Sequence, residues 1–237
     1  MPRQTGNVDA APELDDLSFV DPSARDEVEV AGPDAQSYLQ SQIAQEVRSQ
    51  EIGESQWTLV LDPSGKIDAL ARITRTGDDR FVLDTDAGFG EQLAARISRF
   101  KIRVDADVTF STAENDQASD VNEAARIAAG WPRMGSEIVP GETLPAETGV
   151  LDLAVNFTKG CYPGQELVER MNSRGAAAPQ SLRILEVGED VAVGVAVTDS
   201  DGVEVGRVTS VAPGGGVALG YVKRGSGVGQ IPPHQSP

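Results

Sequence analysis

One short stretch decides how the rest of this sequence is interpreted. Residues 159–166 are Lys159-Gly160-Cys161-Tyr162-Pro163-Gly164-Gln165-Glu166. The apolar residues immediately before it, at 155–158, predict a strand. The two glycines permit sharp backbone turns, and residues 165–171 have the pattern of a helix. The stretch therefore predicts a strand, a tight turn and a helix, with a cysteine in the turn.

That residue, Cys161, is the only cysteine of the chain. Neither an intramolecular disulfide nor a cysteine-rich metal site can therefore form, and we predict no metal. The partial positive charge of the predicted helix N-terminus and the charge of Lys159 both favour a thiolate, which indicates a redox-active thiol. The alternative is a buried cysteine that packs as a small hydrophobe, and composition alone favours it.

Upstream of this stretch the hydrophobic patterns predict an α+β arrangement. Strands are predicted over 27–30, 57–61, 67–73, 80–84 and 104–110. Helices are predicted over 35–47 and 88–100. The order β-α-β-β-β-α-β suggests a split α+β sandwich with an antiparallel sheet.

Around and beyond the stretch, the patterns predict mostly turns and short strands. Residues 111–122 have the composition of a linker, 123–129 are predicted to be a short helix, and 131–145 a long ordered loop. Val-rich strands are predicted over 191–197, 203–211 and 217–222. We therefore expect four parts: a flexible acidic N-terminus at 1–25, a main domain at 26–180, a small β domain at 181–224 and a disordered tail at 225–237.

Composition limits the possible partners. The chain of 237 residues has a formal net charge of -17, which argues against nonspecific binding of DNA. Its start carries no apolar h-region and no apolar run is long enough to span a membrane, so we predict a cytoplasmic protein without a membrane partner. The single histidine, His234, lies in the predicted tail, which makes a Cys-His or Ser-His hydrolytic centre improbable.

One short segment departs from this acidic background. It contains four basic residues that could bind an anionic ligand or RNA: Arg96, Arg99, Lys101 and Arg103. A solvated helix end is the alternative explanation of such a charge run.

The motif Lys-Gly-Cys-Tyr-x-Gly-Gln-Glu at 159–166 resembles the signature of YgfZ-type folate-binding proteins, a family related to the glycine cleavage T-protein. Matches in the first helix (34–42), the first hairpin (62–67), the approach to the signature (126–147) and the C-terminal β region (205–220) support the resemblance, which covers about residues 27–224.

The resemblance implies a T-protein-like fold of split β-α-β halves with antiparallel sheets, followed by a small all-β barrel-like domain. It implies a tetrahydrofolate cofactor at 26–180, and a role in iron-sulfur protein assembly or maintenance and, through it, in tRNA modification. Iron-sulfur client proteins would then be partners. Cys161 with Lys159 would be the redox centre. The implied cofactor-binding residues are Arg126, Tyr162, Gly164, Gln165 and Glu166.

Two features depart from the family. T-protein-like aminomethyltransferases tend to carry an Arg-x-Glu-x-Gly arrangement, whereas Ala128 stands at the acidic position here. The middle segment near 111–122 is also short. A folate-binding accessory protein is our leading interpretation, and the alternatives are a folate-dependent aminomethyltransferase and a structural adaptor that has lost its folate pocket.

Overall fold

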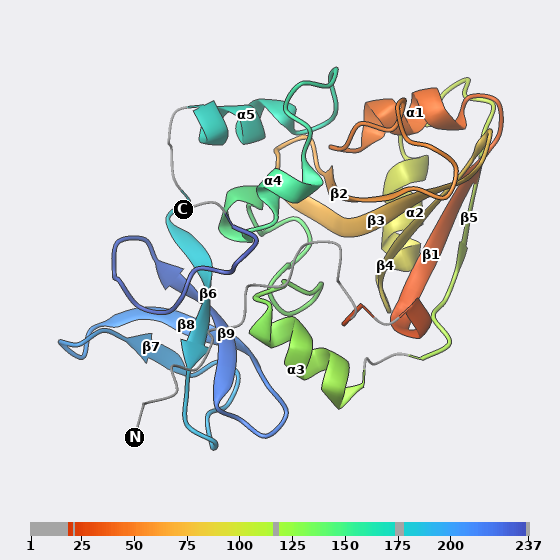
Figure 1. Cartoon of the computed structure of the whole chain (residues 1–237). Helices are drawn as coiled ribbons and strands as arrows, with labels where there is room; N and C mark the ends of the chain where they lie inside the picture. The colour runs from red at the N-terminus through yellow and green to blue at the C-terminus, as the bar shows by residue number, and fades with distance from the viewer. Residues whose placement is uncertain (1–18, 21, 116–118, 174–177, 236–237) are drawn as a thin grey trace, which may run out of the picture.

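The computed structural model describes residues 19–20, 22–115, 119–173 and 178–235. These residues form an α+β structure with a larger sheet built from residues 25–111 and a smaller one built from residues 180–223 (Figure 1). The loops, short helices and the helix α3 between residues 119 and 173 lie beside and between the two sheets.

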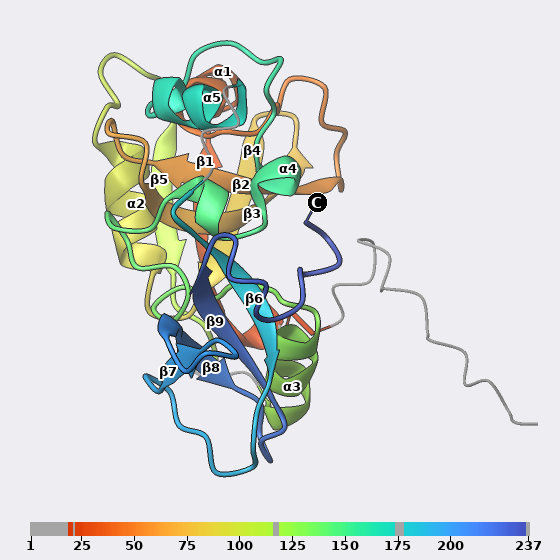
Figure 2. The ribbon, with the colours of Figure 1, turned by 90° about the vertical axis from the view of Figure 1, so that its left-hand side faces the viewer.

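The first sheet is five-stranded and antiparallel, with the order β2-β3-β4-β1-β5. Its strands are β1 (Arg25–Ala31), β2 (Ser55–Leu61), β3 (Ile67–Gly77), β4 (Arg80–Asp86) and β5 (Asp107–Ser111). In β1, Val28 and Val30 are buried while Glu27 and Glu29 face outward, the alternation expected of a strand with one face on the core. Helices α1 (Ala35–Gln42) and α2 (Gly90–Ser98) pack on this sheet (Figure 2).

The elements that follow are shorter. They are α3 (Asp120–Ala128), the 3-10 turn η2 (Pro145–Glu147), α4 (Leu151–Ala154) and α5 (Gln165–Ser173). The second sheet is antiparallel with the order β6-β9-β8-β7, from β6 (Gln180–Glu186), β7 (Ala196–Thr198), β8 (Glu204–Val211) and β9 (Val217–Lys223).

Several local predictions are wrong. The first helix ends at Gln42 rather than near residue 47, and residues 155–158, where a strand was expected, are irregular backbone and a turn that follow α4. The linker expected at 111–122 is shorter, because β5 includes Ser111 and α3 begins at Asp120. The strand expected at 191–197 is reduced to β7, and β6 was not predicted.

The second sheet is open, so the predicted barrel is not found. Strands β6 and β7 lie at opposite edges, and no pairing joins them among the described residues. The short β7 leaves little edge to pair, and Gln230 occupies the edge of β6 through two backbone hydrogen bonds with Ile184.

The two chain ends also differ from the prediction. Residues 225–235, expected to be disordered, contain turns and one residue, Gln230, that pairs with Ile184 of β6. Of the N-terminus expected to be flexible at 1–25, residues 1–18 and 21 lie outside the described residues, while Pro22–Ala24 form the 3-10 turn η1 and Arg25 begins β1.

A buried carboxylate joins the second sheet to the loop that follows α3. Glu137 is 1% exposed, and its Oε2 accepts from Arg126 Nη1 at 3.1 Å and from the backbone N of Arg133 at 3.0 Å. Its Oε1 accepts from the hydroxyls of Thr209 (2.7 Å) and Ser210 (2.6 Å) of β8. Four donors therefore compensate the cost of burying this charge.

We expect Glu137→Gln to lower the free energy of unfolding by about 3 kcal/mol or more, because it leaves a buried arginine and two hydroxyls with poorer partners. Urea unfolding measures the loss. The matched control is Glu166→Gln, an exposed carboxylate paired only with Arg170, which should cost no more than about 0.5 kcal/mol. Equal effects of the two substitutions would contradict this role of Glu137.

Candidate functional site

Lys159 fixes the start of the signature loop, residues 159–166. Its ammonium group is buried and donates to the carbonyl oxygens of Gln40 (2.7 Å), Ile43 (2.6 Å) and Gln45 (2.9 Å). These carbonyls lie at and just beyond the C-terminal end of α1, where backbone acceptors lack helical partners and a cation is favoured. One side chain thus satisfies three acceptors that lie more than 110 residues away in the sequence.

Burial lowers the pKa of Lys159 to about 8, and nearby Glu46 acts in the opposite direction. At pH 7 most molecules therefore carry Lys159 as the ammonium ion, which can donate all three hydrogen bonds. The same ammonium lies 5.2 Å from the centroid of the Tyr162 ring, an arrangement that stabilises a desolvated cation.

Gly164 fixes the other end of the loop. It has φ of +81°, and a methyl group there would lie 2.6 Å from the carbonyl oxygen of Asp62 and 2.8 Å from Cα of Gly65. Gly65 in turn packs under Leu167 of α5. The signature loop is therefore pressed against the turn between β2 and β3, and only glycine fits at position 164.

Between Lys159 and Gly164, one side chain of the loop points into the protein and another points to solvent. Tyr162 is 7% exposed, and its hydroxyl is buried without a hydrogen-bond partner among the described residues. Burial raises the pKa of Tyr162 to about 12. Cys161 is exposed. The thiol therefore lies at the surface of a loop whose neighbouring residues 159 and 162 are buried.

The last two residues of the motif point to the surface of α5. Gln165 donates to Glu169 at 2.6 Å, and Glu166 accepts from Arg170 at 2.5 Å. These are i,i+4 contacts on one helix. The structure brings Lys159, Cys161, Tyr162 and Gly164 together with α1 and the first hairpin, while Gln165 and Glu166 make local contacts only.

Arg126 lies elsewhere, at the end of α3. All five of its N–H groups have acceptors in the protein: Glu123, the carbonyl of Trp131, Glu137 and the hydroxyl of Ser210. An arginine with every donor engaged has none left for a ligand. Its geometry is that of a structural residue at the junction of α3 and β8, and its role in folate binding stays a prediction.

The four basic residues from Arg96 to Arg103 do not form one patch. Arg96 is buried and donates to the carbonyl of Leu61 at 2.6 Å and to Asp68 at 3.1 Å. Arg99 and Arg103 are exposed, and Lys101 bonds the backbone of Ala106. The prediction of a four-residue anion site is therefore wrong in including Arg96.

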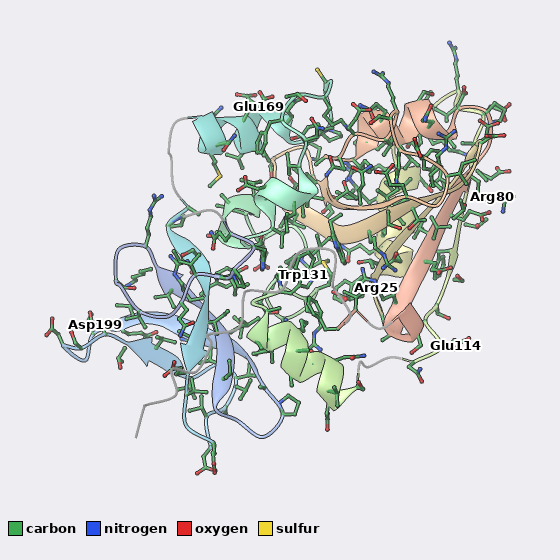
Figure 3. The ribbon with its side chains drawn as sticks, viewed as in Figure 1. Arg25, Arg80, Glu114, Trp131, Glu169 and Asp199 are labelled. Atoms are coloured by element: carbon green, nitrogen blue, oxygen red, sulfur yellow. The ribbon has the colours of Figure 1, made fainter. Side chains whose placement is uncertain are left out.

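An aromatic centre was missed by the sequence analysis. Trp131 is 4% exposed and contacts three rings, with centroid distances of 4.7 Å to Trp57, 6.2 Å to Phe19 and 5.4 Å to His234. It lies between the two sheets, near Arg25 (Figure 3). The available signal was that the chain contains two tryptophans and that one directly follows Gly130.

Three clefts differ in size and chemistry. Residues 136–147 and strands β8 and β9 line one of about 710 Å³, and apolar side chains of the second sheet line another of about 520 Å³. A cavity of only about 40 Å³ lies beside Trp131 and Arg126. None of the three is lined by residues 159–166.

In the part of the chain that the structure describes, no helix is long and apolar enough to cross a bilayer. Among the same residues, no group of three or more histidine, cysteine or acidic side chains is arranged to bind a metal ion.

The chain is similar to several known proteins. The model of the GCVT N-terminal domain matches residues 15–119. The tRNA-modifying protein YgfZ of Cronobacter sakazakii is 25% identical over 68% of this chain and 71% of its own length. The chain is therefore similar to YgfZ-type, T-protein-like proteins.

Two further relatives and one solved structure extend the comparison. The mitochondrial iron-sulfur cluster assembly factor IBA57 homolog of Pyricularia oryzae is 26% identical over 86% of this chain and 67% of its own length. An uncharacterized protein of Haemophilus influenzae is 27% identical, and the alignment spans 63% of this chain and 66% of that protein. The glycine cleavage system aminomethyltransferase T from Bartonella henselae has a TM-score of 0.72 at 18% identity, covering 86% of this chain and 77% of its own, which shows a shared fold.

We expect Gly164→Ala to destabilise the protein by at least about 1–2 kcal/mol, because a side chain at positive φ is strained and the new methyl group meets backbone atoms. Thermal unfolding measures the change. Gly160→Ala in the same loop is the control, since Gly160 has no positive φ and nothing lies within 4 Å of the added methyl. A Gly164→Ala protein as stable as the control would show that the loop is not held against the hairpin.

Proposed function

We propose that this protein is an accessory factor for iron-sulfur proteins, which displays Cys161 as a redox-active thiol and binds tetrahydrofolate at the aromatic centre around Trp131. The observation that carries the proposal is the contrast within the signature loop. Lys159 and Tyr162 are buried, Gly164 is pressed onto the first hairpin, and the thiol between them is exposed.

An exposed thiol adds nothing to the hydrophobic core, so the core does not explain why Cys161 stands in this loop. Its backbone, however, is held on both sides by buried contacts. This arrangement restricts the position of the sulfur and leaves it open to a large partner, as display of a reactive group requires. A cysteine that packs in the core as a small hydrophobe, the alternative for Cys161 from the sequence, does not have this geometry.

Thiol-disulfide exchange is the chemistry available to a lone exposed cysteine. The Cys161 thiolate would attack one sulfur of a disulfide in glutathione disulfide or in a client, form a new S–S bond and release the other sulfur as a thiolate. Any disulfide of Cys161 is intermolecular, because the chain has no second cysteine. This step needs no group beyond the two partners.

The relatives support the cellular role. The names of two of them refer to tRNA modification and to iron-sulfur cluster assembly. Iron-sulfur clients and an indirect effect on tRNA modification are therefore parts of the proposal. A cytoplasmic location remains a prediction.

The aromatic centre has suitable side chains for binding folate, but the cavity beside it is too small. Trp131 and Trp57 provide aromatic surfaces for a pteridine ring, and Arg25 lies 5.3 Å from the Trp57 ring. The adjoining cavity of about 40 Å³, however, is far smaller than the several hundred cubic ångströms of an ordinary ligand site. In this conformation the centre does not accommodate a pteridine, so we assign no chemical step to folate.

The aminomethyltransferase alternative requires a carboxylate free to act near the ligand. Asp84 and Asp86 are paired with Arg25, and Glu123 is paired with Arg126. Ala128 replaces the acidic residue of the related transferases. The carboxylates around the centre are thus held in ion pairs, which favours an accessory role over catalysis of group transfer.

We expect native Cys161 to react with iodoacetamide at a rate within about tenfold of the unfolded protein, and to form a mixed disulfide with glutathione disulfide. Intact-mass spectrometry detects both adducts, and dithiothreitol should remove the second. In cells that lack the protein, wild type and Gly160→Ala should restore the activity of an iron-sulfur enzyme, whereas Cys161→Ser should not. A thiol that reacts only after unfolding, or full restoration by Cys161→Ser, would refute the proposed role.

We expect 5-formyltetrahydrofolate at one hundred times its dissociation constant to stabilise the protein by about 2.7 kcal/mol, since a ligand that binds only the folded state shifts unfolding by mass action. For a chain of this size the melting temperature should rise by about 5–10 °C. Differential scanning fluorimetry measures the shift, with p-aminobenzoylglutamate, which lacks the pteridine, as the control ligand. An unchanged melting temperature at millimolar ligand would remove folate from the proposal.

A further inference from the structure

Residues 230–235, called here the 230–235 strap, cross from the second sheet to the aromatic centre. Gln230 exchanges two backbone hydrogen bonds with Ile184, of 2.8 and 3.0 Å. Pro232 then covers Gly130, where an added methyl group would lie 2.6 Å from Cβ of Pro232. The strap therefore has a defined position along β6 and over the residue that precedes Trp131.

His234 places its ring on the aromatic centre. Its centroid lies 5.4 Å from that of Trp131, with an angle of 58° between the planes. The imidazole also hydrogen bonds the backbone of Ala129, and burial lowers the pKa of His234 to about 4. At pH 7 the strap thus puts a neutral nitrogen heterocycle against Trp131.

The fit of the strap is incomplete at two atoms. Nε2 of His234 and Oε1 of Gln235 are buried and have no hydrogen-bond partner among the described residues. A methyl group at Gly149 would lie 3.6 Å from the first atom and 3.5 Å from the second, so both atoms flank the same point. Unpaired buried polar atoms cost about 1–3 kcal/mol each. His234 and Gln235 therefore leave this position at a lower free-energy cost than fully paired side chains would.

We propose that the 230–235 strap is an internal occupant of the folate site, and that the ligand binds at Trp131 only after His234 and Gln235 leave. This inference rests on the proposed function, and its structural basis is the contact of the His234 ring with Trp131. Closure by the strap reduces the population that can bind, so the apparent dissociation constant exceeds the intrinsic one by the inverse of the open fraction.

The first test is calorimetric titration of 5-formyltetrahydrofolate into wild type, His234→Ala and Ile231→Ala. Loss of one ring contact should tighten binding to His234→Ala by about two- to tenfold. Ile231 belongs to the same strap but its side chain is exposed, so Ile231→Ala should bind like wild type. Equal or weaker binding by His234→Ala would overturn the proposal that the strap occupies the site, while leaving the proposal of folate binding intact. No binding to any of the three proteins would overturn both proposals.

The second test needs no substitution. Hydrogen exchange of the wild-type amides of Gln230, His234 and Gln235, followed by mass spectrometry of the peptide that contains them, should become faster when 5-formyltetrahydrofolate is added, because the ligand selects the open strap. The exchange of β3 in the same sample should stay constant or become slower. Slower exchange in the strap on addition of ligand would overturn the proposal, since the strap would then close over the ligand instead of yielding to it.

Discussion

The buried ammonium of Lys159 is the interaction on which the site depends. Taking a charge out of water is costly unless it is fully paired, and here three backbone carbonyls at the end of α1 supply the pairing. The same three bonds satisfy carbonyls around the end of the helix at Gln42 and hold the first residue of the signature loop against it. Gly164 then needs only to close the loop onto the hairpin for Cys161 to be held in place.

A second buried network holds the other half of the molecule. Glu137 and Arg126 connect the loop after α3 to β8, and Trp131 lies between these residues in the sequence. The thiol and the aromatic centre are therefore built on different supports, one at the end of α1 and the other at the junction of the sheets.

Much of the first sheet could be predicted from sequence, because alternation such as that of Val28 and Val30 directly reflects burial of one face. The end of α1 could not be predicted in this way, since the lysine that binds the carbonyl oxygens there lies more than 110 residues downstream. Arg126 and Arg96 were assigned to ligand binding because a sequence shows which residues are charged. It does not show the acceptors within the protein with which these arginines form hydrogen bonds. The 230–235 strap was assigned to disorder on its Pro and Gly content, which carries no information about the contacts of Gln230 with β6 or of His234 with Trp131.

The state of the Lys159 ammonium group tests the central claim most directly. Nitrogen-detected NMR of ¹⁵N-lysine-labelled protein near pH 6 would show whether the hydrogens of Nζ exchange slowly and couple to the carbonyl carbons of Gln40, Ile43 and Gln45. The account predicts one protected lysine signal with such couplings, lost in Lys159→Met. A Lys159 signal whose hydrogens exchange as fast as those of the exposed Lys223 would contradict it, because the loop that carries Cys161 would then lack its anchor.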